Sequence, residues 1–250
     1  MVKKIVVIFA FCAVLFAGSA GQEKTLRNAA VLISEADLYC SFFVADKAPR
    51  LKIVSVPAGI EKTILADGDP FYAAGGTLAG LKEGQVMAIV EAGSSLTGGK
   101  AKGVNLMFRR GRAKLVRIDK ERVLANVERA CAPVMVGNGL VPFVEREGLL
   151  GHDLGFPAKF GPEGTRTGSI IFLNGEVAQI GSGQWALIDL GAEAGLKFGQ
   201  QLGVFHPGDK DRPAEPIGNA IIIDAGRGAA TIKILSAKDA IRVGDLVQAR

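Results

Sequence analysis

The sequence predicts an all-β fold of two tandem, related small β-barrel-like modules after an N-terminal signal peptide. Three observations predict this fold: an internal repeat, short segments that alternate apolar and polar residues, and 33 glycines that separate these segments as turns. The repeat aligns Gly68–Gly93 with Gly183–Gly208 without gaps, and nine of the 26 positions are identical. A glycine-rich composition gives roughly two or three such matches by chance, so the repeat indicates two copies of one module.

The first twenty residues have the layout of a cleavable signal peptide. Lys3 and Lys4 precede an apolar run, Ile5–Ala17, and the small residues Gly18 and Ala20 suit cleavage after Ala20. The run is shorter than the about 20 residues of a spanning helix, and no later segment is long and apolar enough to span a membrane. We therefore expect export to the periplasm or cell envelope, with no transmembrane segment after cleavage. The alternative is an uncleaved N-terminal anchor helix.

Net charge and local composition limit what the rest of the chain can bind and how it divides into modules. The formal charge of +5, to which Lys3 and Lys4 contribute two, is too small to indicate nucleic-acid binding. Three prolines and many glycines without sustained periodicity mark a linker in the middle of the chain. Helix is expected only near Gln22–Ala36 and in a turn near Ala237–Ala240. The expected divisions are a signal peptide at 1–20, a first β module at 21–141, a Pro/Gly-rich linker at 142–167 and a second β module at 168–250.

Short alternating segments locate the strands of the two modules. Such strands at intervals of about 8–12 residues are typical of small barrels or sandwiches. Strands are expected at residues 51–56, 71–74, 85–91, 114–118, 122–128, 168–173, 185–190, 200–205, 221–223 and 231–235.

Each copy carries one glycine-spaced turn between two of its strands, with the pattern Gly-x-x-x-Gly-Leu-x-x-Gly. The second and third glycines permit positive φ on either side of the leucine. The leucine is the large aliphatic residue of the turn, and we expect it to close the end of the core. The motif residues are Gly76, Gly80, Leu81 and Gly84 in the first copy, and Gly191, Gly195, Leu196 and Gly199 in the second.

Two cysteines, Cys40 and Cys131, remain after removal of the signal peptide. In an oxidising compartment an even pair indicates a disulfide. Closing a loop of about ninety residues stabilises a fold by roughly 4 kcal/mol in the chain-entropy model. The alternative is a pair of buried free thiols that pack as small apolar side chains.

The charge distribution is most uneven between residues 100 and 122, where nine basic residues face two acidic ones. A cationic face of this kind can bind an anionic envelope polymer, lipid headgroups or an acidic envelope protein. The alternative is an ordinary solvated surface whose charges are neutralised by acidic neighbours in the folded protein. The candidate surface comprises Lys100, Lys102, Arg109, Arg110, Arg112, Lys114 and Arg117, with Lys120 and Arg122 beyond them.

Residues for catalysis are scarce. The chain has two histidines, His152 and His206, and no third ligand at zinc spacing accompanies them, so we expect no metal and no cofactor. No Gly-x-Ser-x-Gly nucleophile elbow occurs. Residues 93–100 resemble a phosphate-binding loop, but Ala101 stands where that loop needs Ser or Thr. One enzymatic alternative stays open, an exported hydrolase with a site at His152–Asp153.

The turn motif, with the C-terminal sequence Val-Gly-Asp-Leu-Val at 243–247, resembles the C-terminal domain of flagellar assembly protein T. It is also similar to β-barrel modules of bacterial envelope proteins, some of which accompany LysM domains. The resemblance implies a β-barrel fold and an envelope location, and it carries no catalytic residues. We therefore expect a non-enzymatic envelope binding or assembly protein that contacts its partner through the basic stretch and the groove between the modules. A flagellar assembly accessory is a further alternative.

Overall fold

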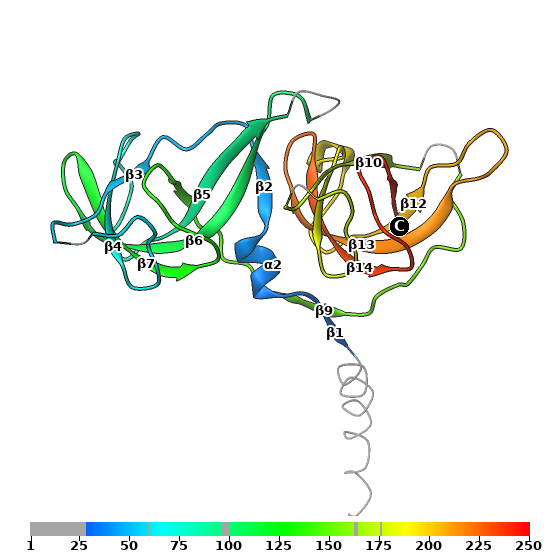
Figure 1. Ribbon diagram of the computed structural model, residues 1–250, viewed down its shortest axis with the longest axis horizontal. Helices are drawn as coiled ribbons and strands as arrows, with labels where there is room; N and C mark the ends of the chain where they lie inside the picture. The colour runs from blue at the N-terminus through cyan, green and yellow to red at the C-terminus, as the bar shows by residue number, and fades with distance from the viewer. Residues whose placement is uncertain (1–28, 60, 97–100, 163–164, 176) are drawn as a thin grey trace, which may run out of the picture.

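The computed structural model describes residues 29–59, 61–96, 101–162, 165–175 and 177–250. Figure 1 shows two β-barrels side by side, with a short helix, α2 (Glu35–Cys40), and the strand β2 (Phe42–Ala45) between them. The predicted signal peptide at 1–20 lies outside the described residues and stays a prediction. No helix in the described part of the chain is long and apolar enough to cross a membrane.

The first barrel closes because its sheet returns on itself. Its strands follow the order β6-β5-β8-β3-β4-β7, and β7 pairs again with β6. The core is filled by apolar side chains from alternate positions, with Phe71, Ile89 and Leu115 completely buried. Strand β2 lies outside this ring and pairs with the first part of β6. The six strands are β3 (Lys52–Ser55), β4 (Pro70–Ala74), β5 (Val86–Ser95), β6 (Asn105–Ile118), β7 (Arg122–Ala130) and β8 (Gly139–Pro142).

The second barrel repeats the connectivity of the first. Its closed order is β10-β11-β14-β13-β12-β15, so both barrels join their first, second, fifth, fourth, third and sixth strands in a ring. The prediction of two tandem related β-barrel modules is therefore confirmed. The strands are β10 (Thr167–Leu173), β11 (Trp185–Ile188), β12 (Gln201–His206), β13 (Glu215–Ala225), β14 (Ala230–Ala237) and β15 (Leu246–Ala249).

Equivalent hydrogen bonds show where the copies differ in length. Gly84 N donates to Leu115 O at 2.8 Å, and in the second barrel Gly199 N donates to Ile222 O at 2.9 Å. The glycines are 115 positions apart and the acceptors 107, so the β5–β6 hairpin of the first barrel is eight residues longer. This longer hairpin extends β6 toward the second barrel.

The turn motif behaves as expected at its second and third glycines. Gly80, Gly84, Gly195 and Gly199 have φ values of 90°, 81°, 74° and 78°. Leu196 is buried in the second core, whereas Leu81 packs only partly buried against the first. Gly191 is needed for a different reason: its backbone is extended, and a Cβ atom there would lie 2.3 Å from Gly226 O.

The helix expected at Gln22–Ala36 is wrong at residues 29–34, and of its described residues only Glu35 and Ala36 are helical. Residues Ala30–Ile33 form strand β1, which pairs with β9 (Leu149–Gly151), and residues 22–28 lie outside the described chain. Helix α2 begins only after Ser34, whose side chain and that of Asp37 form a capping box. The partner of β1 is more than a hundred residues away, so local sequence could not indicate the strand.

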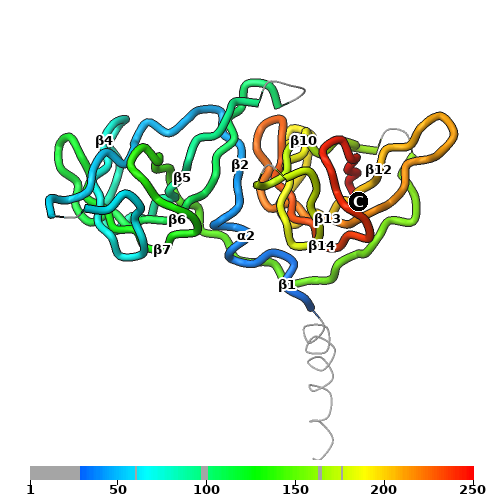
Figure 2. The backbone as a smooth tube through the Cα atoms, in the orientation of Figure 1, coloured from blue at the N-terminus to red at the C-terminus, as the bar shows by residue number. Residues whose placement is uncertain are grey.

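The described residues of the segment expected as a linker, 142–167, pack against both barrels, and at its start Pro142 pairs with Met87 of the first barrel. Figure 2 shows it crossing from the first barrel to the second beside β1. Phe160 packs edge-on against Phe205 with ring centroids 4.9 Å apart, and the Gln201 side chain bonds to Leu154 N and His152 O. These contacts hold the crossing segment along the second barrel.

We predict that Gly84→Ala lowers the free energy of unfolding by about 1–2 kcal/mol, because an L-residue is strained in the left-handed region. Space does not limit this position, since no atom lies within 4 Å of a Cβ added there. Urea titration measures the change. Gly181→Ala is the matched control, because it has equal space and no left-handed φ, and a loss within about 0.5 kcal/mol is expected. Equal losses in the two variants would contradict the role of φ.

Candidate functional site

The two barrels meet along an apolar contact, which we call the inter-barrel seam. Phe42 and Leu106 of the first barrel's extension pack with Leu187 and Ala229 of the second. Phe42 also meets Phe172 edge-on, with ring centroids 5.4 Å apart. Burial of these side chains supplies the association energy of the seam, because apolar surface leaves water there.

Helix α2 is bonded to the second barrel through Asp37. Its Oδ1 accepts a hydrogen bond from Trp185 Nε1 at 2.8 Å, and its Oδ2 accepts one from Lys233 Nζ at 2.7 Å. Asp37 is buried, and burial alone would raise its pKa. The hydrogen bonds from Lys233, Ser34 and Trp185 outweigh burial and hold the pKa of Asp37 below its ordinary value.

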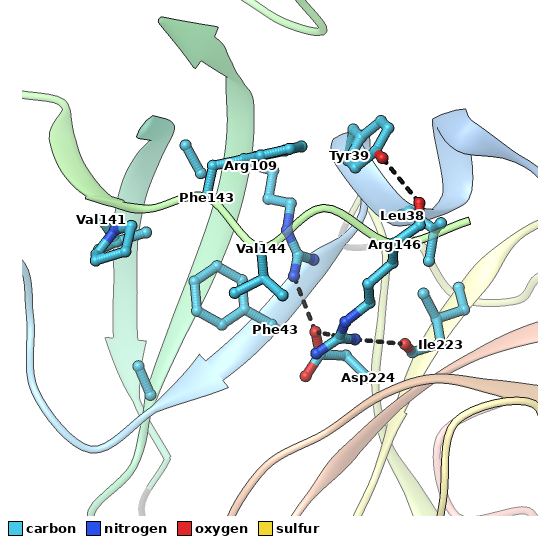
Figure 3. Close-up of a pocket in the computed structure, with 13 residues that line it drawn as sticks. Leu38, Tyr39, Phe43, Arg109, Val141, Phe143, Val144, Arg146, Ile223 and Asp224 are labelled. Atoms are coloured by element: carbon cyan, nitrogen blue, oxygen red, sulfur yellow. Dashed lines mark hydrogen bonds and ion pairs between the residues drawn. The ribbon is translucent and has the colours of Figure 1, made fainter. Parts of the chain in front are cut away.

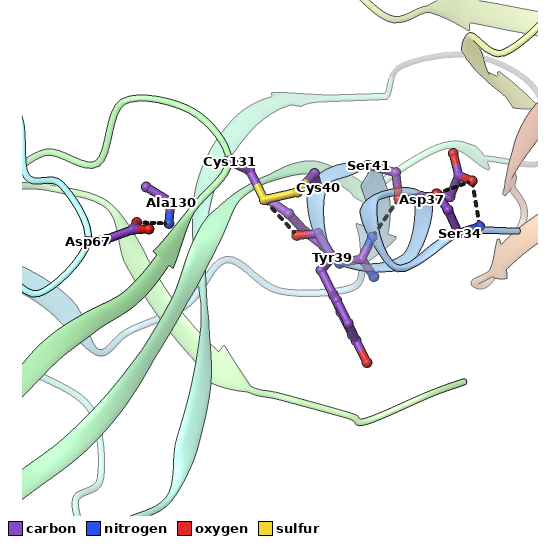
Figure 4. Close-up of a disulfide and its surroundings, with 9 residues drawn as sticks. Ser34, Asp37, Tyr39, Cys40, Ser41, Asp67, Ala130 and Cys131 are labelled. Atoms are coloured by element: carbon purple, nitrogen blue, oxygen red, sulfur yellow. Dashed lines mark hydrogen bonds between the residues drawn. A yellow bond between two sulfur atoms is a disulfide. The ribbon is translucent and has the colours of Figure 1, made fainter. Parts of the chain in front are cut away.

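The same helix is bonded covalently to the first barrel. Figure 4 shows the disulfide between Cys40, the last residue of α2, and Cys131, which follows β7. The expected pairing is thus present, with a Cα–Cα distance of 5.4 Å and a sequence separation of 91. Since α2 is fixed to one barrel by a disulfide and to the other by Asp37, it sets their relative position.

Arg109 is the residue of the basic stretch that enters the seam. Its Nη2 donates to Asp224 Oδ2 of the second barrel at 2.9 Å, and its Nη1 donates to Ser41 Oγ and Phe42 O. The guanidinium also lies 4.4 Å from the ring centroid of Phe43. Burial lowers the pKa of Arg109, the charge of Asp224 opposes this shift, and the charge of Arg146 adds to it. Arg109 therefore joins the barrels and is not an exposed cation.

A pocket of about 350 Å³ opens beside this ion pair at the junction of the barrels. We call it the inter-barrel pocket. Its walls are mostly apolar, and Figure 3 shows Arg109 and Arg146 converging on Asp224 at one side. Arg146 Nη1 lies 3.4 Å from both Asp224 Oδ2 and Ile223 O, and Tyr39 Oη donates to Arg146 O at 2.8 Å. The pocket is lined by Leu38, Tyr39, Phe43, Ala45, Ala88, Arg109, Val141, Pro142, Phe143, Val144, Arg146, Ile223 and Asp224.

The other residues of the candidate basic surface do not gather at one place. Lys100 lies outside the described residues, whereas Lys102 and Lys114 are exposed. Three arginines of this set have carboxylate partners, and Lys102 lies in the β5–β6 hairpin, away from the later part of β6. The three pairs are Arg110 with Glu91, Arg112 with Glu128 at 2.8 Å, and Arg117 with Asp119 at 3.2 Å.

Sequence reasoning missed Arg146, Asp224 and the aromatic residues of the pocket. Arg146 lies in the segment that was interpreted as a linker, and acidic residues flank it. Asp224 ends a run of three isoleucines, and a carboxylate at the end of so apolar a strand is a usable signal for a buried ion pair. Its partner Arg109 is 115 residues earlier, so only the folded chain identifies the pair.

His152 and Asp153 lie outside the inter-barrel pocket. The His152 side chain is exposed, and its backbone carbonyl accepts from Gln201. The Asp153 carboxylate accepts from Gly155 N and Asn219 Nδ2, and these bonds lower the pKa of Asp153 although burial would raise it. No group of three or more metal-ligating side chains is positioned to hold an ion in the described parts of the chain.

His206 lies between two carboxylates at the end of β12. Its Nδ1 is 2.8 Å from Asp245 Oδ1, and its Nε2 is 3.4 Å from Asp239 Oδ2. The hydrogen bond with Asp245 is the largest cause that raises the pKa of His206, and partial burial opposes it. His206 thus links β12 to the turn before β15.

Comparison with known proteins adds no relative. No family model matches the chain, and no curated protein is significantly similar to it. The resemblance to flagellar assembly protein T therefore stays a prediction.

We predict that Asp224→Ala lowers the free energy of unfolding by about 3 kcal/mol, because it leaves the largely buried Arg109 guanidinium without its carboxylate. Denaturant titration measures the loss. Asp46→Ala is the control, since Asp46 also bridges the barrels, through Arg227, but this pair is exposed and contributes about 1 kcal/mol or less. Similar losses in both variants would show that burial of the Arg109 pair is not decisive.

We predict that His206→Asn destabilises the protein more at pH 5.5 than at pH 9. The raised pKa means that the folded state binds the proton more tightly than the unfolded chain. The stabilisation is complete below the ordinary pKa of 6.5 and is lost as the pH rises through the raised value. Thermal unfolding at several pH values measures it, with the exposed His152→Asn as the control variant. A difference that grows with pH would contradict this assignment.

Proposed function

We propose that this protein is a non-enzymatic, exported cell-envelope binding or assembly protein that holds its partner in the inter-barrel pocket. The observation that carries the proposal is the pocket itself: an apolar, aromatic-walled hollow with two guanidiniums and one carboxylate at its side. Ligand sites have this composition, with mostly apolar walls and a few placed polar groups. The partner is an envelope protein or an anionic envelope polymer.

Export is supported by two independent features. The N-terminal charge, apolar run and small residues match a secretory signal. The Cys40–Cys131 disulfide is a bond that persists in oxidising compartments and is rare in the cytosol.

A binding role is favoured over catalysis by the side chains at the pocket. Among the described residues that line it there is no Ser, Thr, Cys, Lys or His to serve as a nucleophile or a base. Asp224 is bonded by two arginines. The hydrolase alternative at His152–Asp153 is disfavoured because the Asp153 carboxylate is occupied by Gly155 and Asn219. The flagellar accessory alternative stays a prediction.

A photo-crosslinking experiment tests the proposal. Val144 lies at the pocket and the residue is 64% exposed, so p-benzoyl-phenylalanine can replace it with little disturbance. We expect one covalent adduct with an envelope component when the protein is expressed and irradiated in its own cell. Mass spectrometry of the recovered chain should show a start at Gly21 and Cys40 linked to Cys131.

The control carries the same photoreactive residue at Lys210, in the exposed β12–β13 loop. This loop projects from the far end of the second barrel (Figure 1). Adducts of equal yield at both positions, or none at Val144, would rule out the pocket as the contact site. A chain that retains Met1 and free thiols would rule out export.

A further inference from the structure

The inter-barrel pocket holds more positive than negative charge. Arg109 and Arg146 both contact the same oxygen of Asp224, Oδ2, so two cations share one carboxylate oxygen. Glu145 and Glu147 flank Arg146 in the chain but do not line the pocket. The lining therefore has a net charge of +1 from these three side chains. An anion that enters the pocket would balance it.

Arg146 is the arginine that can receive such an anion. Arg109 is held by Asp224, Ser41 and Phe42. The Arg146 guanidinium lies over the Phe198 ring, 5.9 Å from its centroid, and within the described chain its hydrogen bonds are made by Nη1 alone, at 3.4 Å. Its Nε and Nη2 donors remain available, and its side chain is 39% exposed. A guanidinium presents its donors as a planar fork that fits a carboxylate with two parallel hydrogen bonds.

The charges of the two arginines also oppose each other. The nearby charge of Arg146 adds to the effect of burial in lowering the pKa of Arg109. A carboxylate bound to Arg146 would reduce this repulsion, so the site gains more from an anion than an isolated surface arginine does.

The rest of the pocket fits one apolar side chain. Tyr39 and Phe143 stand with ring centroids 4.9 Å apart, and Phe43 and Val144 complete the wall around them. A volume of about 350 Å³ is at the lower end of the range for ligand pockets, roughly 300–1,000 Å³. This size and the aromatic walls suit a compact apolar group next to the anion.

The backbone beside the pocket indicates a peptide. Residues 144–147 are exposed and belong to no helix or strand. Their N–H groups donate to no other group in the part of the chain that the structure describes. A bound peptide has carbonyl groups that can accept from such donors, as in strand addition, whereas a lipid chain has none.

We infer that the inter-barrel pocket binds the free C-terminal end of a partner polypeptide whose last residue is apolar, with the terminal carboxylate on Arg146 and the last side chain packed against the aromatic wall of Tyr39, Phe43 and Phe143. This inference rests on the proposed function, since it names the chemistry of the partner at that same site.

Fluorescence anisotropy with defined peptides tests it. The probes are fluorescein-labelled hexapeptides Gly-Ser-Gly-Ser-Gly-X, with Phe, Leu or Ser as X, each as a free acid and as a C-terminal amide, titrated with the purified full chain. The Phe and Leu acids should bind at least about tenfold more tightly than their amides, because a charge-assisted hydrogen bond contributes about 1.5–3 kcal/mol. They should also bind at least about tenfold more tightly than the Ser acid, which has no apolar side chain. Arg146→Gln should weaken the acids about tenfold and leave the amides unchanged.

The matched control is Arg212→Gln, which removes an equal charge from the distant, exposed β12–β13 loop and should leave binding unchanged. Equal affinity for acids and amides, or no binding of any hexapeptide, overturns the inference. If fluorescein-labelled dodecanoate binds more tightly than every peptide, the peptide inference is wrong and the ligand is a lipid. If these peptides fail while the Val144 crosslink persists, only the ligand class is wrong. If the Val144 crosslink is absent as well, the proposed function itself is wrong.

Discussion

The double attachment of helix α2 is the constraint on which the arrangement of the barrels depends. A helix of six residues is too short to be stable alone, so its position is decided by what it is bonded to. The disulfide of Cys40 fixes it to the first barrel, and the Asp37 carboxylate fixes it to Trp185 and Lys233 of the second. Leu38 and Tyr39 of this helix line the inter-barrel pocket, so the bonds that fix the helix also fix this part of the pocket wall.

Apolar groups at the seam drive association of the barrels, and charged groups set their orientation. The cluster around Phe42 supplies association but little direction, because apolar contact tolerates sliding. The buried carboxylate of Asp37 and the partly buried one of Asp224 require particular partners, and an uncompensated charge at either place is costly. The two ion pairs therefore select one orientation among those that the apolar cluster permits. The same need for pairing concentrates charge beside the pocket.

The duplicated barrels diverge where they meet. Both keep the same strand order, the same turn glycines and equivalent ladder bonds. The first barrel adds a β5–β6 hairpin longer by eight residues and the extra strand β2, and Phe42, Leu106 and Arg109 lie in these additions. The shared barrel is thus the scaffold, and the first barrel contributes to the seam mainly through elements that the second barrel lacks. This division explains why the repeat predicted the fold well and the site poorly.

The sequence by itself determined the β-barrel class, the duplication and the glycines of the turns. These features are local or periodic, since strand alternation, a left-handed φ and a repeated motif are visible within a few residues. The even pair Cys40 and Cys131 was also predictable from the expected compartment. Only the tertiary structure decided that α2 starts at Glu35, that Arg109 is largely buried, and that Arg146 and Asp224 meet it at a pocket. These residues meet only through the packing of one barrel against the other. The residues around an arginine in a basic run do not show whether its side chain pairs with a distant carboxylate or faces solvent.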